Sequence, residues 1–198
     1  MIRRKRTPAL LGVALILTIA WLVCKALAPY TGDGLRPAVQ HHDLNLNRKT
    51  EDYRLENGNL VITEAGKDLW RSPAGWRVTS FCAAEVTHDR KQDLLLVVWK
   101  EGNFGPSRPF WHTGPDRRLS CHLFVFKLTG HILQPIWMSS ALDRPIRSLR
   151  VLDIDGDGRN EILVIEYKTW RQHLTNPISS GETTVWRWQD WGFFRVGI

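Results

Sequence analysis

Most of this chain carries little net charge. Its 198 residues contain 27 lysines and arginines against 20 aspartates and glutamates, which gives a net charge of +7. Five of the basic residues lie before residue 28, where there is no acid, and subtracting them leaves 22 against 20. A nucleic-acid-binding face needs clustered lysine and arginine in the folded part of a protein. We therefore exclude nucleic acid as the leading partner.

The sequence also lacks the motifs of common hydrolases. It has no G-x-S-x-G, no H-E-x-x-H and no phosphate-cradling glycine loop. His112, His122 and His131 are available as bases, and Ser120 and Cys121 lie close to His122 in sequence, but no recognised motif joins them. We therefore predict a protein without catalytic activity, and a hydrolase that acts on envelope polymers is the weaker alternative.

Cysteine is rare, and only Cys82 and Cys121 follow the N-terminal segment. An oxidising compartment permits a disulfide between them. Both, however, lie in or next to predicted strands, where a buried free thiol is equally common. The sequence leaves the paired and the free alternatives open.

What the sequence does contain is a long apolar run near its N-terminus. Residues 7–24 carry no charge and follow the basic cluster RRKR. This pattern predicts a transmembrane signal anchor over residues 1–28, with the basic stub in the cytoplasm and the remainder outside the cell membrane. A cleaved signal peptide is the alternative, because Ala26-Leu27-Ala28 has the form of a cleavage site. Pro29 follows it directly, and proline at that place generally blocks cleavage.

Residues 29–50 are rich in proline, glycine, asparagine, aspartate and histidine and show no apolar period. We predict a juxtamembrane linker there, followed by the folded domain over residues 51–198. The adjacent His41 and His42 have no partner carboxylate or third ligand nearby in sequence, and we interpret them as solvated loop residues.

A repeat organises the exported part. Aligning Glu85 with Asp153, an offset of 153 − 85 = 68, pairs EVTHDRKQDLLLVVWK with DIDGDGRNEILVIEYK. A glycine-turned hairpin precedes each copy, at residues 53–70 and 123–140, and a third hairpin occupies residues 183–196. The module is therefore a hairpin, a strand, an acidic loop and an apolar strand, which occurs twice and half of it a third time.

Four short strands per module with periodic aromatics are typical of propeller blades. We predict an all-β fold of propeller-blade-like repeats, two and a half four-stranded modules behind a single N-terminal transmembrane helix. A propeller closes with about four to eight blades, so the repeats form an open sheet pack or associate with another chain to cover their edges. A single β-sandwich is the alternative. The tryptophans expected mostly in the core are Trp70, Trp76, Trp99, Trp137, Trp186, Trp188 and Trp191.

One loop carries the residue types of a metal site. In DIDGDGRNE, at residues 153–161, three aspartates alternate, two glycines allow a tight turn, and a glutamate lies eight residues after the first aspartate. Alternate carboxylates in a curled loop point at one centre, which suits a hard cation with six to eight oxygen ligands. The glutamate of an EF-hand's twelfth position is missing and the flanks are strand-like, so we predict a calcium loop between β-strands. The predicted ligands are Asp153, Asp155, Asp157, Glu161 and the backbone carbonyl of Arg159.

This loop resembles the D-x-D-x-D-G-x-x-[DE] loops of FG-GAP/VCBS repeats, known from integrin α-chain propellers and many bacterial envelope proteins. The resemblance covers residues 53–196 and implies bound Ca²⁺ in a structural role. In the first copy His88 and Arg90 replace both glycines, which leaves metal binding there open. The residues at the ligand positions of this degenerate loop are Glu85, Thr87, Asp89 and Asp93.

Long, turn-rich connections follow the two acidic-loop strands, at residues 101–120 and 169–181. Long loops at equivalent module positions lie on the same side of a repeat array and often carry function. Their aromatic and basic side chains suit sugar faces and anionic polymers. A self-packed loop is the alternative. The candidate ligand-binding residues are Phe104, Arg108, Trp111, His112, Trp170 and Arg171.

Together these patterns predict a membrane-anchored, extracytoplasmic calcium-binding β-repeat module for binding or assembly at the cell envelope. Its expected partner is an envelope protein or an anionic or glycan polymer, and self-association would cover exposed sheet edges. A structural subunit of an envelope complex is the alternative.

Overall fold

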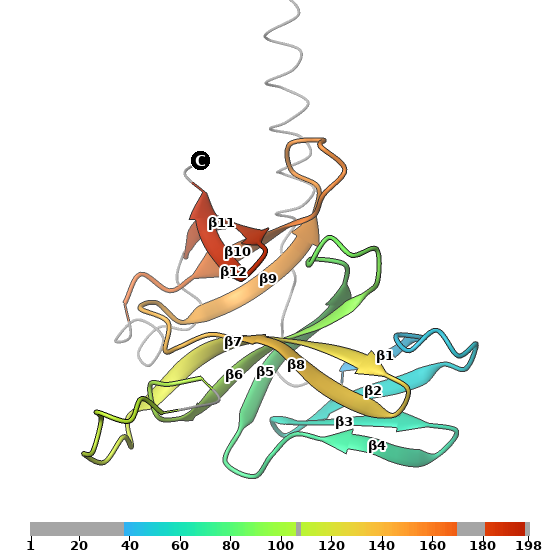
Figure 1. Cartoon of the computed structure of the whole chain (residues 1–198), viewed down its shortest axis with the longest axis horizontal. Coiled ribbons are helices and arrows are strands. Elements are labelled where there is room, and N and C mark those ends of the chain that lie inside the picture. The colour runs from blue at the N-terminus through green and yellow to red at the C-terminus, as the bar shows by residue number, and fades with distance from the viewer. Residues whose placement is uncertain (1–37, 106–107, 170–180, 197–198) are drawn as a thin grey trace, which may run out of the picture. The chain divides into compact units, whose positions relative to one another are not determined.

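The computed structural model describes residues 38–105, 108–169 and 181–196 (Figure 1). These residues form twelve strands and no helix, which confirms the predicted all-β fold. Within them, no helix is long and apolar enough to cross a membrane. The predicted signal anchor, residues 1–28, lies outside the described part of the chain.

The strands form three antiparallel sheets, each made of four strands that follow one another along the chain. The first sheet contains β1 (Ala38–His42), β2 (Glu51–Glu56), β3 (Asn59–Glu64) and β4 (Lys67–Arg71). The second contains β5 (Arg77–Ala84), β6 (Asp93–Glu101), β7 (Leu119–Thr129) and β8 (Ile132–Met138). The third contains β9 (Ile146–Leu152), β10 (Glu161–Glu166), β11 (Glu182–Gln189) and β12 (Gly192–Val196). In Figure 1 the strands of the first sheet are blue to teal, those of the second green to yellow, and those of the third orange to red.

The repeat starts at a different strand from the one predicted. Each sheet is ordered as strand, loop, strand and then hairpin, because β6 pairs with the hairpin that follows it and not with the one before it. The predicted hairpin at residues 53–70 is a meander of β2, β3 and β4. The third module is complete, so the fold has three four-stranded sheets instead of two and a half. Consecutive strands are neighbours in every sheet, the commonest arrangement of antiparallel strands, even where a long loop joins β6 to β7 and β10 to β11.

The predicted linker at residues 29–50 contains a strand in its described portion. β1 pairs with β2 in antiparallel register, and Leu44 is buried in the core. His41 therefore lies on a strand rather than in a loop, with its Nδ1 2.7 Å from Asp52 Oδ1. The prediction was wrong here because β1 is short and the polar loop after it dominates the composition.

The middle sheet is buried on both faces. Leu94 and Leu96 of β6 pack in one apolar cluster with side chains of the first sheet. Leu95 and Val97 pack in a second cluster with side chains of the third sheet. Successive side chains of a strand point to opposite faces. The uninterrupted apolar run of β6 is therefore explained by a neighbouring sheet on each side.

Five of the seven tryptophans expected mostly in the core lie in or against these clusters. Those that are buried or packed against the core are Trp70, Trp76, Trp99, Trp137 and Trp186. Trp191 is an exception, because its position at the turn between β11 and β12 leaves it 76% exposed.

Both described cysteines are free thiols. Cys82 lies on β5 and Cys121 on β7, and β6 runs between these two strands. Neighbouring strands are about 4.8 Å apart, so strands on either side of a third are about 10 Å apart. That separation exceeds the Cα distance that a disulfide spans. The geometry decides the open question in favour of unpaired cysteines.

Candidate metal centre

The predicted calcium loop, residues 153–161, connects β9 to β10. Glu161 is the first residue of β10 and is completely buried, and it accepts a hydrogen bond from the Ile154 N–H at 3.0 Å. Asp153 accepts two more from the loop backbone, from Gly156 N at 2.7 Å and from Gly158 N at 2.9 Å. These bonds curl the loop over the end of the sheet.

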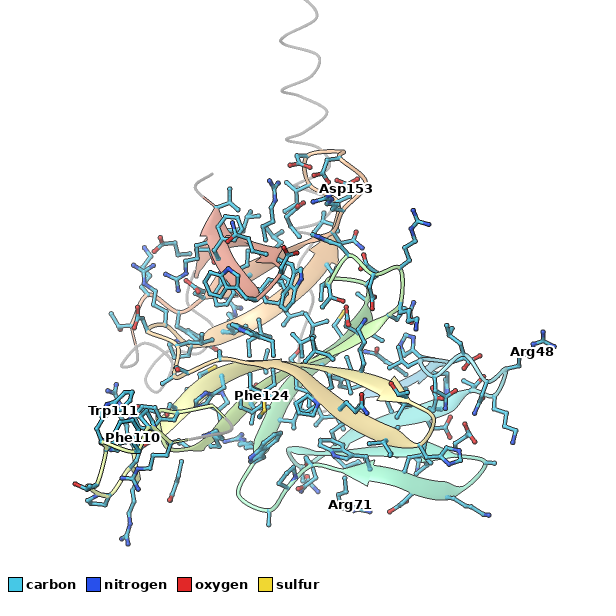
Figure 2. The ribbon with its side chains drawn as sticks, in the orientation of Figure 1. Arg48, Arg71, Phe110, Trp111, Phe124 and Asp153 are labelled. Atoms are coloured by element: carbon cyan, nitrogen blue, oxygen red, sulfur yellow. The ribbon has the colours of Figure 1, made fainter. Side chains whose placement is uncertain are left out.

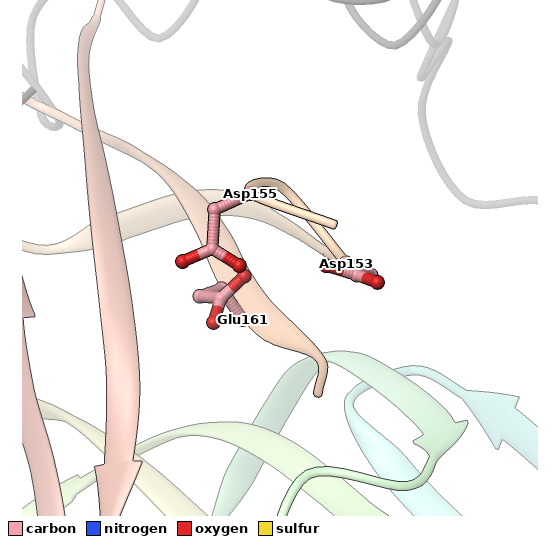
Figure 3. A group of neighbouring side chains, drawn as sticks. All are labelled: Asp153, Asp155 and Glu161. Carbon is pink, nitrogen blue, oxygen red and sulfur yellow. The ribbon is translucent and has the colours of Figure 1, made fainter. Parts of the chain in front are cut away.

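Three predicted ligands come together in this loop. Carboxylate oxygens of Asp153, Asp155 and Glu161 all lie within 4.8 Å of one another, and Figure 3 shows the side chains of Asp155 and Glu161 close together. Asp157 belongs to the same loop but not to this cluster, and its Oδ1 accepts a hydrogen bond from Arg159 N at 2.8 Å. The cluster offers hard oxygen donors, the kind that calcium prefers.

An arginine that sequence reasoning missed lies against this cluster. Arg187 on β11 places its Nε 3.1 Å from Glu161 Oε1 and forms an ion pair with Asp155. Desolvation disfavours the charged form of Asp155, but the Asp157 N–H and the Arg187 guanidinium outweigh it and lower the pKa of this carboxyl. One guanidinium thus balances part of the charge of four loop carboxylates.

The degenerate loop, residues 85–93, holds a lysine in the corresponding place. Lys127 on β7 places its Nζ 2.7 Å from Asp89 Oδ2 and 2.9 Å from Asp93 Oδ1. Asp93 is completely buried and also accepts a hydrogen bond from Val86 N at 3.0 Å. Thr87 Oγ1 lies 3.1 Å from the same carboxylate, whereas Glu85 Oε1 is buried without a partner. The lysine ammonium therefore contacts two of the four predicted ligand residues.

A third loop of the same kind, residues 43–51, connects β1 to β2 and was not predicted. Its sequence DLNLNRKTE places Asp43, Asn45, Asn47 and Glu51 at the spacing of the other two loops. Leu44 N donates to Glu51 Oε2 at 2.8 Å, as Val86 N and Ile154 N do to the ninth residue of their loops. The spacing was the available signal. It was hidden because this loop starts 85 − 43 = 42 residues before the next one, instead of 68.

We call these loops 1 (43–51), 2 (85–93) and 3 (153–161), and they share one backbone conformation. The fourth and sixth residues of every loop have positive φ angles. These residues are glycines in loop 3 but bulkier residues in the other two, where the conformation is strained. The six residues are Leu46 and Arg48, His88 and Arg90, and Gly156 and Gly158.

The three loops lie next to one another along one edge of the array (Figure 1). Asn160 in loop 3 donates from its Nδ2 to the Glu85 carbonyl in loop 2, at 2.9 Å. Leu46 of loop 1 and Lys91 of loop 2 line the same hollow of about 110 Å³. The repeat thus gathers its three polar loops at one place.

No protein-family model, curated protein or solved structure matches this chain. The resemblance to FG-GAP/VCBS repeats therefore stays a prediction. The structure itself shows three equivalent loops with similar backbones and different charges.

The predicted ligand-binding loop leaves the opposite end of β6. Phe110 and Trp111 are 90% and 71% exposed and form an edge-to-face pair with ring centroids 4.9 Å apart. Figure 2 shows them well away from Asp153. Phe104 instead packs on the His112 ring, at 5.1 Å. Arg108 is exposed, and the other two candidates, Trp170 and Arg171, lie outside the described residues.

His122, one of the histidines considered as a base, is buried and bonded to the backbone. His122 is completely buried, and its two ring nitrogens lie 3.0 Å from the Ser139 carbonyl and 3.1 Å from the Gly102 carbonyl. Burial lowers the pKa of this imidazole. His122 therefore ties β7 to the chain on either side of it and does not face solvent.

Proposed function

We propose that this chain is a membrane-anchored, extracytoplasmic β-repeat module that binds calcium structurally and binds a partner at the cell envelope without catalysing a reaction. The observation that carries the proposal is the cluster of Asp153, Asp155 and Glu161, whose carboxylate oxygens approach within 4.8 Å. A cation there neutralises carboxylates that otherwise repel one another and fixes a strand-connecting loop.

The finer part of the fold proposal is that the sheets are propeller-blade-like repeats. Three observations support it: the strand order within each sheet, the equivalent loop between the first and second strands, and face-to-face packing of consecutive sheets. Three blades are fewer than the four to eight of a closed propeller. The proposed module is an open array that is completed by another copy or by a partner.

The donors of loop 3 fit a calcium ion. Four carboxylates and a backbone carbonyl approach the six to eight oxygen ligands that calcium takes, and water supplies the remainder. Arg187 contacts two of the same carboxylates. In the proposed bound state the guanidinium gives up at least its contact with Asp155, which lies at the exposed side of the loop.

Calcium binding to the full-length chain tests this proposal. A ligand that binds only the native state stabilises it by about 2.7 kcal/mol at a hundredfold excess over Kd. Asp155→Asn is expected to reduce this gain and to remove one bound ion in equilibrium dialysis. Asp190→Asn, in the exposed turn between β11 and β12, is the matched control and should change neither. Equal ion binding by the parent and Asp155→Asn would contradict a site in loop 3.

The proposed partner surface is the exposed Phe110–Trp111 pair with Arg108 beside it in sequence. Trp111→Ala should weaken retention on an immobilised anionic polysaccharide by about 2 kcal/mol, as loss of a hot-spot aromatic does. Trp191→Ala, which removes another exposed tryptophan, is the control. Salt should weaken the contribution of Arg108 more than that of Trp111, since only the charge is screened. If Trp111→Ala binds as the parent does, the structural-subunit alternative is favoured.

A further inference from the structure

The last strand of each sheet, β4, β8 or β12, is an edge strand. Among the described strands each of them pairs with one neighbour only, which leaves one row of its backbone N–H and C=O groups without a strand partner. Such an edge pairs readily with another chain, and proteins usually protect it with a β-bulge, a proline or charged side chains. Because the three sheets repeat one strand order, their last strands can be compared directly.

The edges of β4 and β8 are both protected. The register of β4 against β3 shifts at Leu69, where β4 has an extra residue, and three of the five residues of β4 are charged. The register of β8 against β7 shifts at Ile136 in the same way. Pro135 precedes this bulge and has no N–H to donate. Since a bulge bends and twists its strand, neither edge presents a straight row of hydrogen-bonding groups.

The edge of β12 has none of these protections. Its five residues, Gly192–Val196, pair with β11 in unbroken register. The strand contains no proline, and Arg195 is its single charged residue. Phe193 and Phe194 occupy its centre and are only half-buried. A straight, largely apolar edge of this kind is open to pairing with another strand.

The register of the β11–β12 hairpin identifies the backbone groups that β12 leaves free. A turn of two residues joins the two strands at Gln189 and Gly192, and the residues that close such a turn form a hydrogen-bonded pair. Hydrogen-bonded and non-hydrogen-bonded pairs alternate along an antiparallel ladder. Phe193 and Arg195 therefore direct their N–H and C=O groups away from β11, towards the free edge.

We propose that β12 pairs in antiparallel orientation with β12 of a second copy of this chain, about a two-fold axis at Phe194. In this register Phe193 lies opposite the partner's Arg195, and Arg195 lies opposite the partner's Phe193. The free groups of both edges then form four backbone hydrogen bonds, and the third sheets of the two copies become one continuous sheet. This inference rests on the proposed function, an open membrane-anchored array, and names the surface through which the array associates with itself.

Side-chain chemistry favours this register. The Arg195 guanidinium already lies over the ring of Trp186, its neighbour on β11, at 5.5 Å from the ring centroid. The proposed register places the same guanidinium beside a second aromatic side chain. A register shifted by two residues, with its two-fold axis at Arg195, would place two guanidinium groups directly opposite each other, which destabilises a sheet.

The molecule is hollowed on the face of β12 that packs towards the middle sheet. Phe193 contacts the Trp137 ring on this face, with ring centroids 5.4 Å apart. A hollow of about 430 Å³ lies here, lined by Trp137, the exposed Asp143, Phe193 and Arg195 among others. Residues opposite each other in an antiparallel pair lie on the same face. The partner's Arg195 therefore lies on the side where the Asp143 carboxylate supplies the opposite charge.

Disulfide trapping of the full-length chain in isolated membranes tests the pairing. In a Cys24→Ser background, Phe194→Cys should form a disulfide-linked dimer on mild oxidation. The two Cα atoms at the axis are about 4.5 Å apart in a non-hydrogen-bonded pair, which a disulfide spans. Ile132→Cys, at an exposed position of the protected edge strand β8, is the matched control and should stay monomeric. Equal crosslinking at both positions, no crosslinking of Phe194→Cys, or its crosslinking to a different protein would each overturn the proposal.

A charge exchange tests the register, because residue 194 faces itself only when the two-fold axis lies there. Phe194→Lys and Phe194→Glu should each be monomeric in sedimentation velocity, at a detergent-solubilised concentration at which the parent is a dimer. An equimolar mixture of the two variants should recover the dimer. Ile132→Lys is the control and should dimerise as the parent does. Dimers of either Phe194 variant alone, or a mixture that stays monomeric, would contradict this register.

Calcium measurements separate this inference from the proposed function. Asp155→Asn, introduced together with Phe194→Cys, should still form the disulfide-linked dimer, and Phe194→Lys should keep the calcium-dependent gain in melting temperature. A parent that binds calcium but stays monomeric would overturn edge pairing and leave the proposed function standing. A parent that dimerises through β12 without binding calcium would do the reverse. Circular dichroism shows whether each variant keeps the β-sheet fold.

Discussion

The ion pair between Lys127 and Asp89 makes the stability of loop 2 depend on pH. Burial opposes the charged form of Asp89, but the ammonium of Lys127 and the Lys91 N–H lower the pKa of this carboxyl. A lowered carboxyl pKa stabilises the fold above the unfolded-state value of about 3.9, and this stability is lost as the pH falls through the folded-state value. Loop 2 should therefore resist acid as long as Lys127 is present.

The corresponding prediction concerns the acid unfolding midpoint in chelator. Lys127→Met should move this midpoint to higher pH, because Asp89 then loses the ammonium that lowers its pKa and takes up a proton earlier. Tryptophan fluorescence against pH measures the shift. Lys67→Met, at an exposed position of β4, is the control and should unfold at the same pH as the parent. An unchanged midpoint in Lys127→Met would mean that the ion pairs contribute no acid stability.

At the scale of single elements, the three loops adopt the same positive φ angles with glycine and with larger residues. Gly156 and Gly158 have φ angles of 78° and 82°, whereas His88 and Arg90 adopt 61° and 66° in the equivalent loop. A side chain in this left-handed region costs about 1–2 kcal/mol. The loop shape must be held by the hydrogen bonds to its carboxylates, since it forms with and without glycine.

We predict opposite stability changes for two exchanges at the sixth loop position. Gly158→Ala should destabilise the chain by about 1 kcal/mol through the backbone alone, because an added Cβ would meet no atom within 4 Å. Arg90→Gly should stabilise it by a few tenths of a kcal/mol to about 1 kcal/mol, since the strain removed exceeds the entropy lost. Urea unfolding in chelator measures both. Equal changes of the same sign would contradict the argument.

Sequence reasoning predicted the elements whose signals are local. The hairpins at residues 123–140 and 183–196 have a glycine turn between apolar strands, and loop 3 has alternating aspartates with glycines. Loop 1 was missed because asparagines replace two aspartates, and Leu46 and Arg48 occupy the positions where glycine was expected. The partners Lys127 and Arg187 depend on strand register, which sequence periodicity does not fix.

At the scale of the whole molecule, the middle sheet connects two apolar clusters that otherwise share no strand. Leu95 and Leu96 are adjacent in β6, yet each is completely buried in a different cluster. Each contributes to a different sheet–sheet interface. Stability of the two interfaces should therefore be lost together, because both depend on one sheet.

This argument predicts that Leu95→Ala and Leu96→Ala are both severely destabilising. Each should cost about 2–5 kcal/mol, as deletion of a buried leucine side chain generally does. Each variant should still unfold in one transition by fluorescence and by circular dichroism. Leu119→Ala, which truncates a leucine that is 53% exposed, should cost much less. Two separate transitions in either variant would show that the outer sheets unfold independently.

The proposed location of the whole domain rests on RRKR before the apolar run and on Pro29 after Ala28. A reporter enzyme fused after Ile198 should be active only outside the cytoplasm, and the mature chain should retain residues 1–28. Mass spectrometry of the membrane fraction measures the N-terminus. Recovery of a soluble form that begins at Pro29 would replace the anchor with a cleaved signal peptide.

Burial of the middle sheet on both faces also has an evolutionary consequence. The apolar side chains of β6 pack against the first sheet on one face and the third sheet on the other. A substitution on either face must therefore fit the sheet that packs there. Over generations, the middle sheet should therefore change more slowly than the two outer ones. Lineages that diverge in ligand or habitat should differ mainly in the outer sheets and in the loops between strands.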